Sequence, residues 1–209
     1  MFKIFSLLAF LVSINLFSQN SEGFIKTAFN AIQSKNYAAA IDNYSKAISN
    51  NDTYAPAFYG RGLAYFYSDK MNEAIADFKK TLMLDKNYFE AHYAIGICDL
   101  KSSKFNEAIA NFDKALSISN EFPEALYARA NAYYYQENYE KALADYNKAI
   151  QLQPNYGLAY YGRAITNKIL GFNDAALRDF DKYLELNANN DGLEAEVARL
   201  IKEIEMAKN

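Results

Sequence analysis

The chain has 209 residues, of which 51% are hydrophobic and 22% are charged, and its formal net charge is −3. The apolar fraction is enough for a packed core and excludes intrinsic disorder. One cysteine and one histidine exclude a disulfide framework and most zinc sites. The slight negative charge disfavours nucleic acid as a partner, because nucleic-acid binding depends on neutralising phosphates with Lys and Arg. The 18 tyrosines are the unusual feature of the composition.

Residues 1–19 read as a secretory signal peptide. Lys3 gives a short positive start, and an uncharged apolar run follows over residues 4–17. As a helix this run would span roughly 21 Å, which is short of the ~30 Å hydrocarbon core of a bilayer. Ser18 then supplies a small residue for cleavage near Ser18–Gln19.

This reading predicts an exported protein, periplasmic or extracellular in a bacterium, with no stable membrane span after cleavage. The alternative is an N-terminal anchor that is retained. The ending Leu-Phe-Ser-Gln resembles signal peptides of Bacteroidetes-type bacteria.

A period of 34 residues organises the rest of the chain. Alanines recur at this spacing, at Ala40, Ala74, Ala108, Ala142 and Ala176. Five consecutive repeats follow over residues 20–190, with the frames 21–54, 55–88, 89–122, 123–156 and 157–190. Below, position n is the nth residue of such a frame. Apolar residues spaced i, i+4, i+7 predict two helices in each frame.

The residues at six positions of each frame carry a resemblance to a known family. Position 4 is large, positions 8 and 20 are small, and position 24 is aromatic. Position 11 is aromatic in two of the frames, and position 27 is alanine in three of them. The aromatic residues at position 24 are Tyr44, Phe78, Phe112, Tyr146 and Phe180. This pattern resembles the tetratricopeptide repeat (TPR) family. The resemblance implies an all-α fold, an α-solenoid of five helix-turn-helix repeats wound as a right-handed superhelix.

Two departures from the family pattern concern the turns. The family's proline at position 32 is kept only as Pro154, and its glycine at position 15 only as Gly171. Residues 191–209 then predict a capping helix, whose apolar face is Leu193, Val197, Leu200, Ile201 and Ile204. The alternative for this helix is a partner-binding role.

Arginine at position 7 and aspartate at position 23 occur together. The second, fourth and fifth repeats carry the pairs Arg61 and Asp77, Arg129 and Asp145, and Arg163 and Asp179. The other two repeats lack both residues. We therefore expect structural ion pairs, either between the two helices of one repeat or between adjacent repeats.

The resemblance also implies a concave groove, which in the family is lined by positions 2, 5, 9, 12 and 13 and receives peptides. The residues that we expect to bind a partner there are Tyr59, Leu63, Phe66, Tyr67, Tyr93, Ile97, Lys101, Tyr127, Asn131, Tyr134, Tyr135, Tyr161, Ile165 and Lys168. Tyrosine offers contact area and a hydroxyl at a low entropic cost. The alternative is that these tyrosines contact the neighbouring repeat's first helix. The family's carboxylate clamp is absent, since Ile25 and Phe29 stand in its place.

These patterns predict a non-enzymatic scaffold that binds a protein or peptide partner in the tyrosine-lined groove. No catalytic triad, metal-ligand spacing or phosphate-binding loop is found, so we expect no catalytic residue, no cofactor and no metal. The alternative function is binding of a glycan or a cell-wall polymer on the same aromatic row. The partner's identity and the oligomeric state stay open.

Overall fold

The computed structural model describes residues 19–187 and 192–207, and every regular element in these ranges is a helix. The predicted all-α class is therefore confirmed. The predicted signal peptide lies outside the described residues except for Gln19, which begins the first described helix. Within the described ranges, no helix has the length and apolarity that a membrane span needs.

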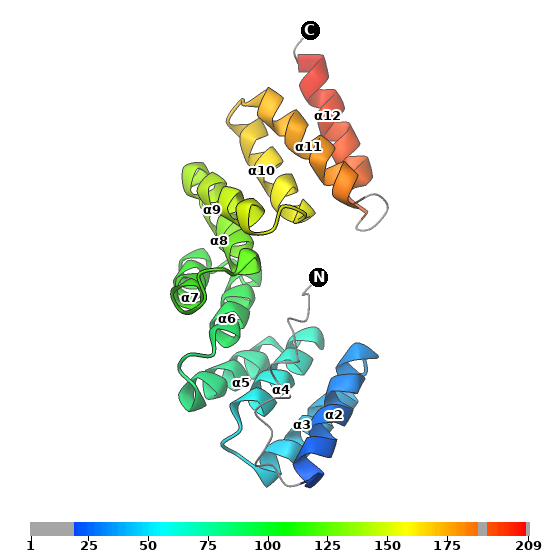
Figure 1. The fold of residues 1–209 in the computed structure, drawn as a ribbon, viewed down its shortest axis with the longest axis vertical. Helices are drawn as coiled ribbons and strands as arrows, with labels where there is room; N and C mark the ends of the chain where they lie inside the picture. The colour runs from blue at the N-terminus through cyan, green and yellow to red at the C-terminus, as the bar shows by residue number, and fades with distance from the viewer. Residues whose placement is uncertain (1–18, 188–191, 208–209) are drawn as a thin grey trace. The chain divides into compact units, whose positions relative to one another are not determined.

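First and second helices alternate along the chain (Figure 1). The first helices are α2 (Gln19–Gln33), α4 (Ala55–Tyr67), α6 (Phe89–Lys101), α8 (Pro123–Tyr135) and α10 (Gly157–Ile169). The second helices are α3 (Tyr37–Asn50), α5 (Met71–Leu84), α7 (Phe105–Ile118), α9 (Tyr139–Leu152) and α11 (Asn173–Asn187). The chain ends with α12 (Glu194–Ala207). Within the units, neighbouring helices pack on one another, as α2 does on α3 and α8 does on α9.

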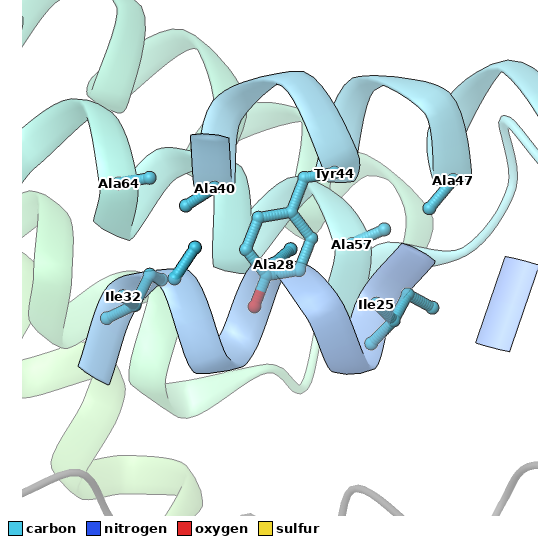
Figure 2. Packing of buried hydrophobic residues seen from close by; sticks show 9 residues of the cluster. Ile25, Ala28, Ile32, Ala40, Tyr44, Ala47, Ala57 and Ala64 are labelled. Carbon is cyan, nitrogen blue, oxygen red and sulfur yellow. The ribbon is translucent and has the colours of Figure 1, made fainter. Parts of the chain in front are cut away.

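The helices form two compact units, which meet in the sequence between Cys98 and Asp99 of α6. We call them the N-terminal and the C-terminal unit. In the N-terminal unit, alanines at the helix crossings are fully buried, and Tyr44 reaches from α3 toward Ala28 of α2 (Figure 2). Small residues at these crossings let the helices approach closely, and the aromatic side chains fill the space beside them.

The C-terminal unit repeats this packing and ends on α12. Phe180 and Tyr183 of α11 are fully buried in one cluster with Val197, Leu200 and Ile204 of α12. The apolar face that the sequence predicts for residues 191–209 thus covers the last second helix. Without α12, the aromatic side chains of α11 would face water.

The turn inside each repeat has a left-handed residue at position 15. Lys35, Asp69, Ser103 and Glu137 have φ values of 59°, 63°, 57° and 60°, and Gly171 has 79°. The following N–H closes the turn by donating back to the helix, as Asn36 does to the carbonyl of Ala31 at 2.8 Å. This is a Schellman motif, which satisfies the last carbonyls of the first helix. The turn therefore forms in all five repeats, although only one of them carries the favoured glycine.

Position 6 is matched to the aromatic ring of the preceding repeat. A Cβ atom added at Gly60 would lie 2.3 Å from the Tyr44 ring, and one at Gly162 would lie 2.6 Å from the Tyr146 ring. Position 6 is glycine where the preceding repeat has tyrosine at position 24, and alanine (Ala94, Ala128) where it has phenylalanine. The pairing indicates that the extra hydroxyl of tyrosine needs the space of the missing methyl group.

Candidate interaction surface on the first helices

The tyrosines at position 5 are half-buried, and Tyr59, Tyr127 and Tyr161 each pack on aromatic rings that follow them in the chain. The ring centroid of Tyr59 lies 5.7 Å from Phe78 and 5.0 Å from Tyr88. That of Tyr127 lies 6.0 Å from Tyr146 and 5.3 Å from Tyr156. One side of these rings belongs to the packing between helices, and the other contributes to the surface. From the sequence, exposure in the groove and packing between helices are alternatives for these tyrosines, whereas in the structure the same side chains take part in packing and remain partly exposed.

Burial has a clear electrostatic effect on Tyr59. It raises the pKa of the Tyr59 hydroxyl well above its usual value, and the nearby Tyr88 and Glu90 add to the rise. Burial likewise raises the pKa of Glu90, with a smaller contribution from Asp85.

Position 9 supplies mostly half-buried aliphatic side chains. Leu63, Ile97 and Ile165 pack along the edge of the core and remain partly exposed. Asn131 is half-buried and accepts a hydrogen bond from the Tyr146 hydroxyl at 2.6 Å. Its amide is thus tied to the second helix of its own repeat, which fixes the orientation of the side chain.

Position 12 departs from the predicted groove in the second repeat. Phe66 is only 7% exposed and belongs to the core between α4 and α5, so it offers no surface to a partner. The apolar stripe of α4 is wider than the periodicity indicates, and Phe66 lies inside it. Tyr134 in the fourth repeat is half-buried, with its ring 5.8 Å from that of Tyr139.

Position 13 carries a stacked aromatic pair in each unit. Tyr67 stacks on Tyr37 of the preceding repeat at 5.6 Å, and Tyr135 stacks on Phe105 at 5.3 Å. Tyr135 is 60% exposed, which makes it the most accessible of the tyrosines predicted to bind a partner. Lys101 is also exposed. The stacking partners Tyr37 and Phe105, both at position 17, are not among the residues that the sequence predicts to bind a partner.

In the fifth repeat, α12 engages the predicted groove residues. Lys168 forms an ion pair with Glu203 at 3.1 Å. Tyr161 has its pKa raised to about 12, first by burial and then by the charge of Glu196 and a hydrogen bond to it. Ile165 packs against the cluster that contains Val197 and Leu200. These three residues therefore contact α12, which follows the last repeat.

The structure brings together the three Arg and Asp pairs that the sequence indicates. Arg61 donates to both carboxylate oxygens of Asp77, from Nε at 2.7 Å and from Nη2 at 2.8 Å. Arg129 and Arg163 bind Asp145 and Asp179 in the same bidentate way. The aspartates are only 6–7% exposed, so these pairs lie largely out of water.

A third hydrogen bond connects each arginine to the preceding repeat. Nη1 donates to Ser45 from Arg61 at 3.1 Å, to Asp113 from Arg129 at 2.5 Å, and to Asn147 from Arg163 at 2.6 Å. Of the two arrangements that the sequence leaves open, the pairs of position 7 with position 23 lie within one repeat, and the contact with the preceding repeat is made to the residue at position 25 instead. Burial lowers the pKa of Arg129, but the bonds to Asp145 and Asp113 outweigh this and raise it.

Within the described residues, no group of three or more His, Cys, Asp or Glu side chains is placed to hold a metal ion. Cys98 is fully buried in the core of the N-terminal unit. His92 is half-buried at the start of α6.

Comparisons with known proteins agree with the repeat pattern. The model of the family described as tetratricopeptide repeat matches residues 55–88 and 123–156, and a second TPR model matches residues 99–136. No curated protein matches the sequence.

Several solved structures share the fold. MamA from Desulfovibrio magneticus RS-1, from its residue 41 onward, aligns with a TM-score of 0.73 and 20% identity, over 85% of this chain and 100% of that chain. TTC0263, a thermophilic TPR protein from Thermus thermophilus, aligns with a TM-score of 0.71 and 16% identity, over 86% and 97%.

YrrB is described as a TPR protein with an unusual peptide-binding site, and it aligns with a TM-score of 0.66 and 21% identity, over 91% of this chain and 97% of that chain. The two matches to the first family model coincide with the 34-residue frames 55–88 and 123–156, and the paired helices have the fold of solved TPR proteins. The repeats that the family models match, over residues 55–88, 99–136 and 123–156, are tetratricopeptide repeats.

Proposed function

We propose that the protein is a non-enzymatic scaffold, which holds a segment of a partner protein on the tyrosine-rich faces of its first helices. The observation that carries this proposal is the placement of the position-5 tyrosines. The rings of Tyr59 and Tyr127 pack on the following aromatic residues, yet these side chains remain partly exposed. Rigid aromatic side chains of this kind bind with little loss of conformational entropy.

Two further points support a peptide or helical segment as the occupant. The similar fold of YrrB is described with a peptide-binding site, although at 21% identity this shows the fold alone. The aliphatic residues Leu63 and Ile97 offer apolar contact between the tyrosines, which suits the side chains of a polypeptide.

The test is capture of a partner from exported bacterial proteins by the immobilised protein. We expect the double variant Tyr93→Ala, Tyr127→Ala to lose at least tenfold in captured material. The matched control is Met83→Ala with Phe172→Ala, since these side chains are 74% and 57% exposed outside the predicted groove. Equal capture by both variants would contradict the proposed surface.

Two additional measurements make the result decisive. Thermal unfolding of each variant shows whether the fold is retained, and Tyr135→Ala provides a more conservative test because that side chain is 60% exposed. Protease treatment of the exported fraction should abolish capture. Capture that survives protease and depends on the tyrosines would instead favour the glycan or cell-wall alternative.

We also propose that the protein acts outside the bacterial cytoplasm. The support is the sequence of residues 1–19 with its positive start, apolar run and small residue before a polar stretch. Mass spectrometry of the protein from its native host should find an N-terminus at or near Gln19. Recovery of a chain that still begins at Met1 would refute cleavage.

A further inference from the structure

An arginine at position 7 makes two kinds of hydrogen bond in the second, fourth and fifth repeats. It binds the aspartate at position 23 of its own repeat and thereby joins the two helices of that repeat. It also donates to the residue at position 25 of the preceding repeat, which is Ser45, Asp113 or Asn147. We call this set of contacts an arginine clamp. Each of these three clamps lies inside one of the two units.

The third repeat has other residues at all three clamp positions. Its position 7 is Ile95 and its position 23 is Asn111, and position 25 of the repeat before it is Lys79. A lysine ammonium has three donors and no acceptor, so it repels a guanidinium instead of accepting a hydrogen bond from it. The three positions therefore change together at one place in the chain.

The structure gives Ile95 and Asn111 different contacts, each inside one unit. Ile95 is only 6% exposed and belongs to the core cluster of Phe66 and Phe78 in the N-terminal unit. Asn111 donates to the carboxylate of Asp99 at 3.0 Å, within the C-terminal unit. The residue at position 7 thus serves one unit and the residue at position 23 serves the other. The boundary between the two units falls inside this repeat.

The first repeat also has no clamp, since Thr27 stands at position 7 and Asn43 at position 23. Both side chains donate to backbone carbonyls of their own helices. The two helices nevertheless pack within one unit, because Tyr44 of α3 is buried in one cluster with Ala28 of α2. The third repeat differs from the first because its two clamp positions belong to different units.

An interior repeat without a clamp is the weak place in an array of this kind. Each repeat contacts only its neighbours, so stability is approximately a sum of terms for single repeats and for their interfaces. A bidentate, charge-assisted bond between nearly buried groups strengthens such a term. Where one interior term is smaller than the others, the array opens there into blocks that unfold separately.

We propose that the third repeat is a joint, at which the N-terminal and C-terminal units unfold as separate blocks while the helices inside each unit stay paired. Ile95 and Asn111 replace the clamp there, so the contacts at these positions are made within one block. The inference goes beyond the proposed function, because it concerns how the array opens and not what it binds. Its consequence is that α4 and α8, which carry Tyr59 and Tyr127, open independently.

The first test destabilises one unit at a time in the full-length chain. Arg61→Ala removes the clamp of the N-terminal unit, and Arg163→Ala removes the last clamp of the C-terminal unit. Hydrogen exchange of the amides, read by NMR, reports the opening of each helix. We expect each variant to speed exchange of the best-protected amides by at least about tenfold in its own unit and by less than about twofold in the other. Equal acceleration in both units would overturn the proposal.

Restoration of the clamp then locates the joint. A chain with Ile95→Arg, Asn111→Asp and Lys79→Ser carries all three kinds of clamp residue in and before the third repeat. In this background, Arg61→Ala should speed exchange in both units by similar factors, because the two blocks then open together. A loss that is still confined to the N-terminal unit would contradict the assignment of the joint to the missing clamp.

The first repeat provides the matched control. Thr27→Arg with Asn43→Asp installs the same pair at positions that both belong to the N-terminal unit. In this background the effect of Arg61→Ala should stay within that unit. Spreading of the effect in the control as well would refute the special place of the third repeat.

The reverse substitution tests the proposal even if the core does not tolerate Ile95→Arg. Arg129→Ile with Asp145→Asn copies the residue pair of the third repeat into the fourth. In the unchanged background we expect Arg163→Ala to speed exchange in α7 as much as in α10, whereas in the copied background α7 should be spared. Circular dichroism checks that each variant keeps its helix content. Equal acceleration of α7 in both backgrounds would show that the clamp does not join blocks, and the proposal would be wrong.

Discussion

The three Arg and Asp pairs are the most directly testable feature at the residue scale. Each arginine is locked in a bidentate contact with a nearly buried aspartate and is also tied to the preceding repeat. Loss of either partner leaves the other charge without its hydrogen bonds in a region of low exposure. Such pairs contribute to stability far more than exposed pairs on a helix surface do.

We expect Arg61→Ala and Asp77→Ala each to lower the free energy of unfolding by about 2–3 kcal/mol, and the double variant to lose much less than their sum. A double-mutant cycle measured by denaturant unfolding checks this coupling. The control is the pair of Lys46 and Asp42, whose side chains are 50% and 59% exposed and whose coupling we expect to be below about 0.5 kcal/mol. Additive losses at Arg61 and Asp77 would contradict the pairing.

Replacement of glycine by alanine usually stabilises a helix, but at position 6 we expect it to destabilise the protein. Gly60→Ala should destabilise the protein by about 1–3 kcal/mol, because the new methyl group would overlap the Tyr44 ring. Tyr44→Phe in the same chain should recover part of the loss. Gly23→Ala is the control, since nothing lies within 4 Å of its Cβ position, and this change in α2 should stabilise the protein by about 0.5–1 kcal/mol.

At the scale of elements, the turn between the two helices of a repeat carries strain in four of the five repeats. Lys35, Asp69, Ser103 and Glu137 adopt a left-handed conformation that glycine adopts without cost. The hydrogen bonds of the Schellman motif and the packing of both helices impose this conformation. The local sequence of these turns is therefore suboptimal for the structure that they form.

Glu137→Gly should raise the free energy of unfolding by about 0.5–1 kcal/mol, because relief of the left-handed strain exceeds the added freedom of the unfolded chain. Gly171→Ala should lower it by about 1 kcal/mol for the same reason. Chemical denaturation of both variants provides the measurement. A loss of stability in Glu137→Gly would mean that the side chain contributes more than the backbone strain costs.

At the scale of the whole molecule, buried tyrosines link stability to alkaline pH. Burial raises the pKa of Tyr161 to about 12, and it raises the pKa of Tyr44, Tyr88 and Tyr146 still further. In the unfolded chain these hydroxyls titrate near pH 10. Between the two pKa values the folded state keeps protons that the unfolded state has lost, so stability falls as the pH rises.

We expect the denaturant midpoint to be steady between about pH 7 and 9 and to fall from about pH 10 upward. Absorbance of the ionised phenol should appear together with unfolding for the buried tyrosines. Tyr146→Phe removes one such group, and it should make the alkaline fall less steep at some cost in the hydrogen bond to Asn131. A flat stability profile through about pH 11.5 would contradict the burial of these hydroxyls.

The sequence by itself determines the repeat, the helix pairs and the faces that are buried. A period of 34 residues with small residues at positions 8 and 20 and an aromatic residue at position 24 specifies which side of each helix packs. The joint occurrence of Arg at position 7 and Asp at position 23 indicates their pairing, and the match of Gly60 to Tyr44 could have been found in the same way. These features are local or recur at a fixed spacing, so they can be read from one chain.

Only the tertiary structure decides how side chains from different repeats share space. It places Phe66 in the core, ties Lys168 to Glu203, and makes the position-5 tyrosines part of the packing as well as of the surface. The physical reason is that helical periodicity fixes the direction of a side chain, whereas the distance between helices and the choice of rotamer fix what it touches.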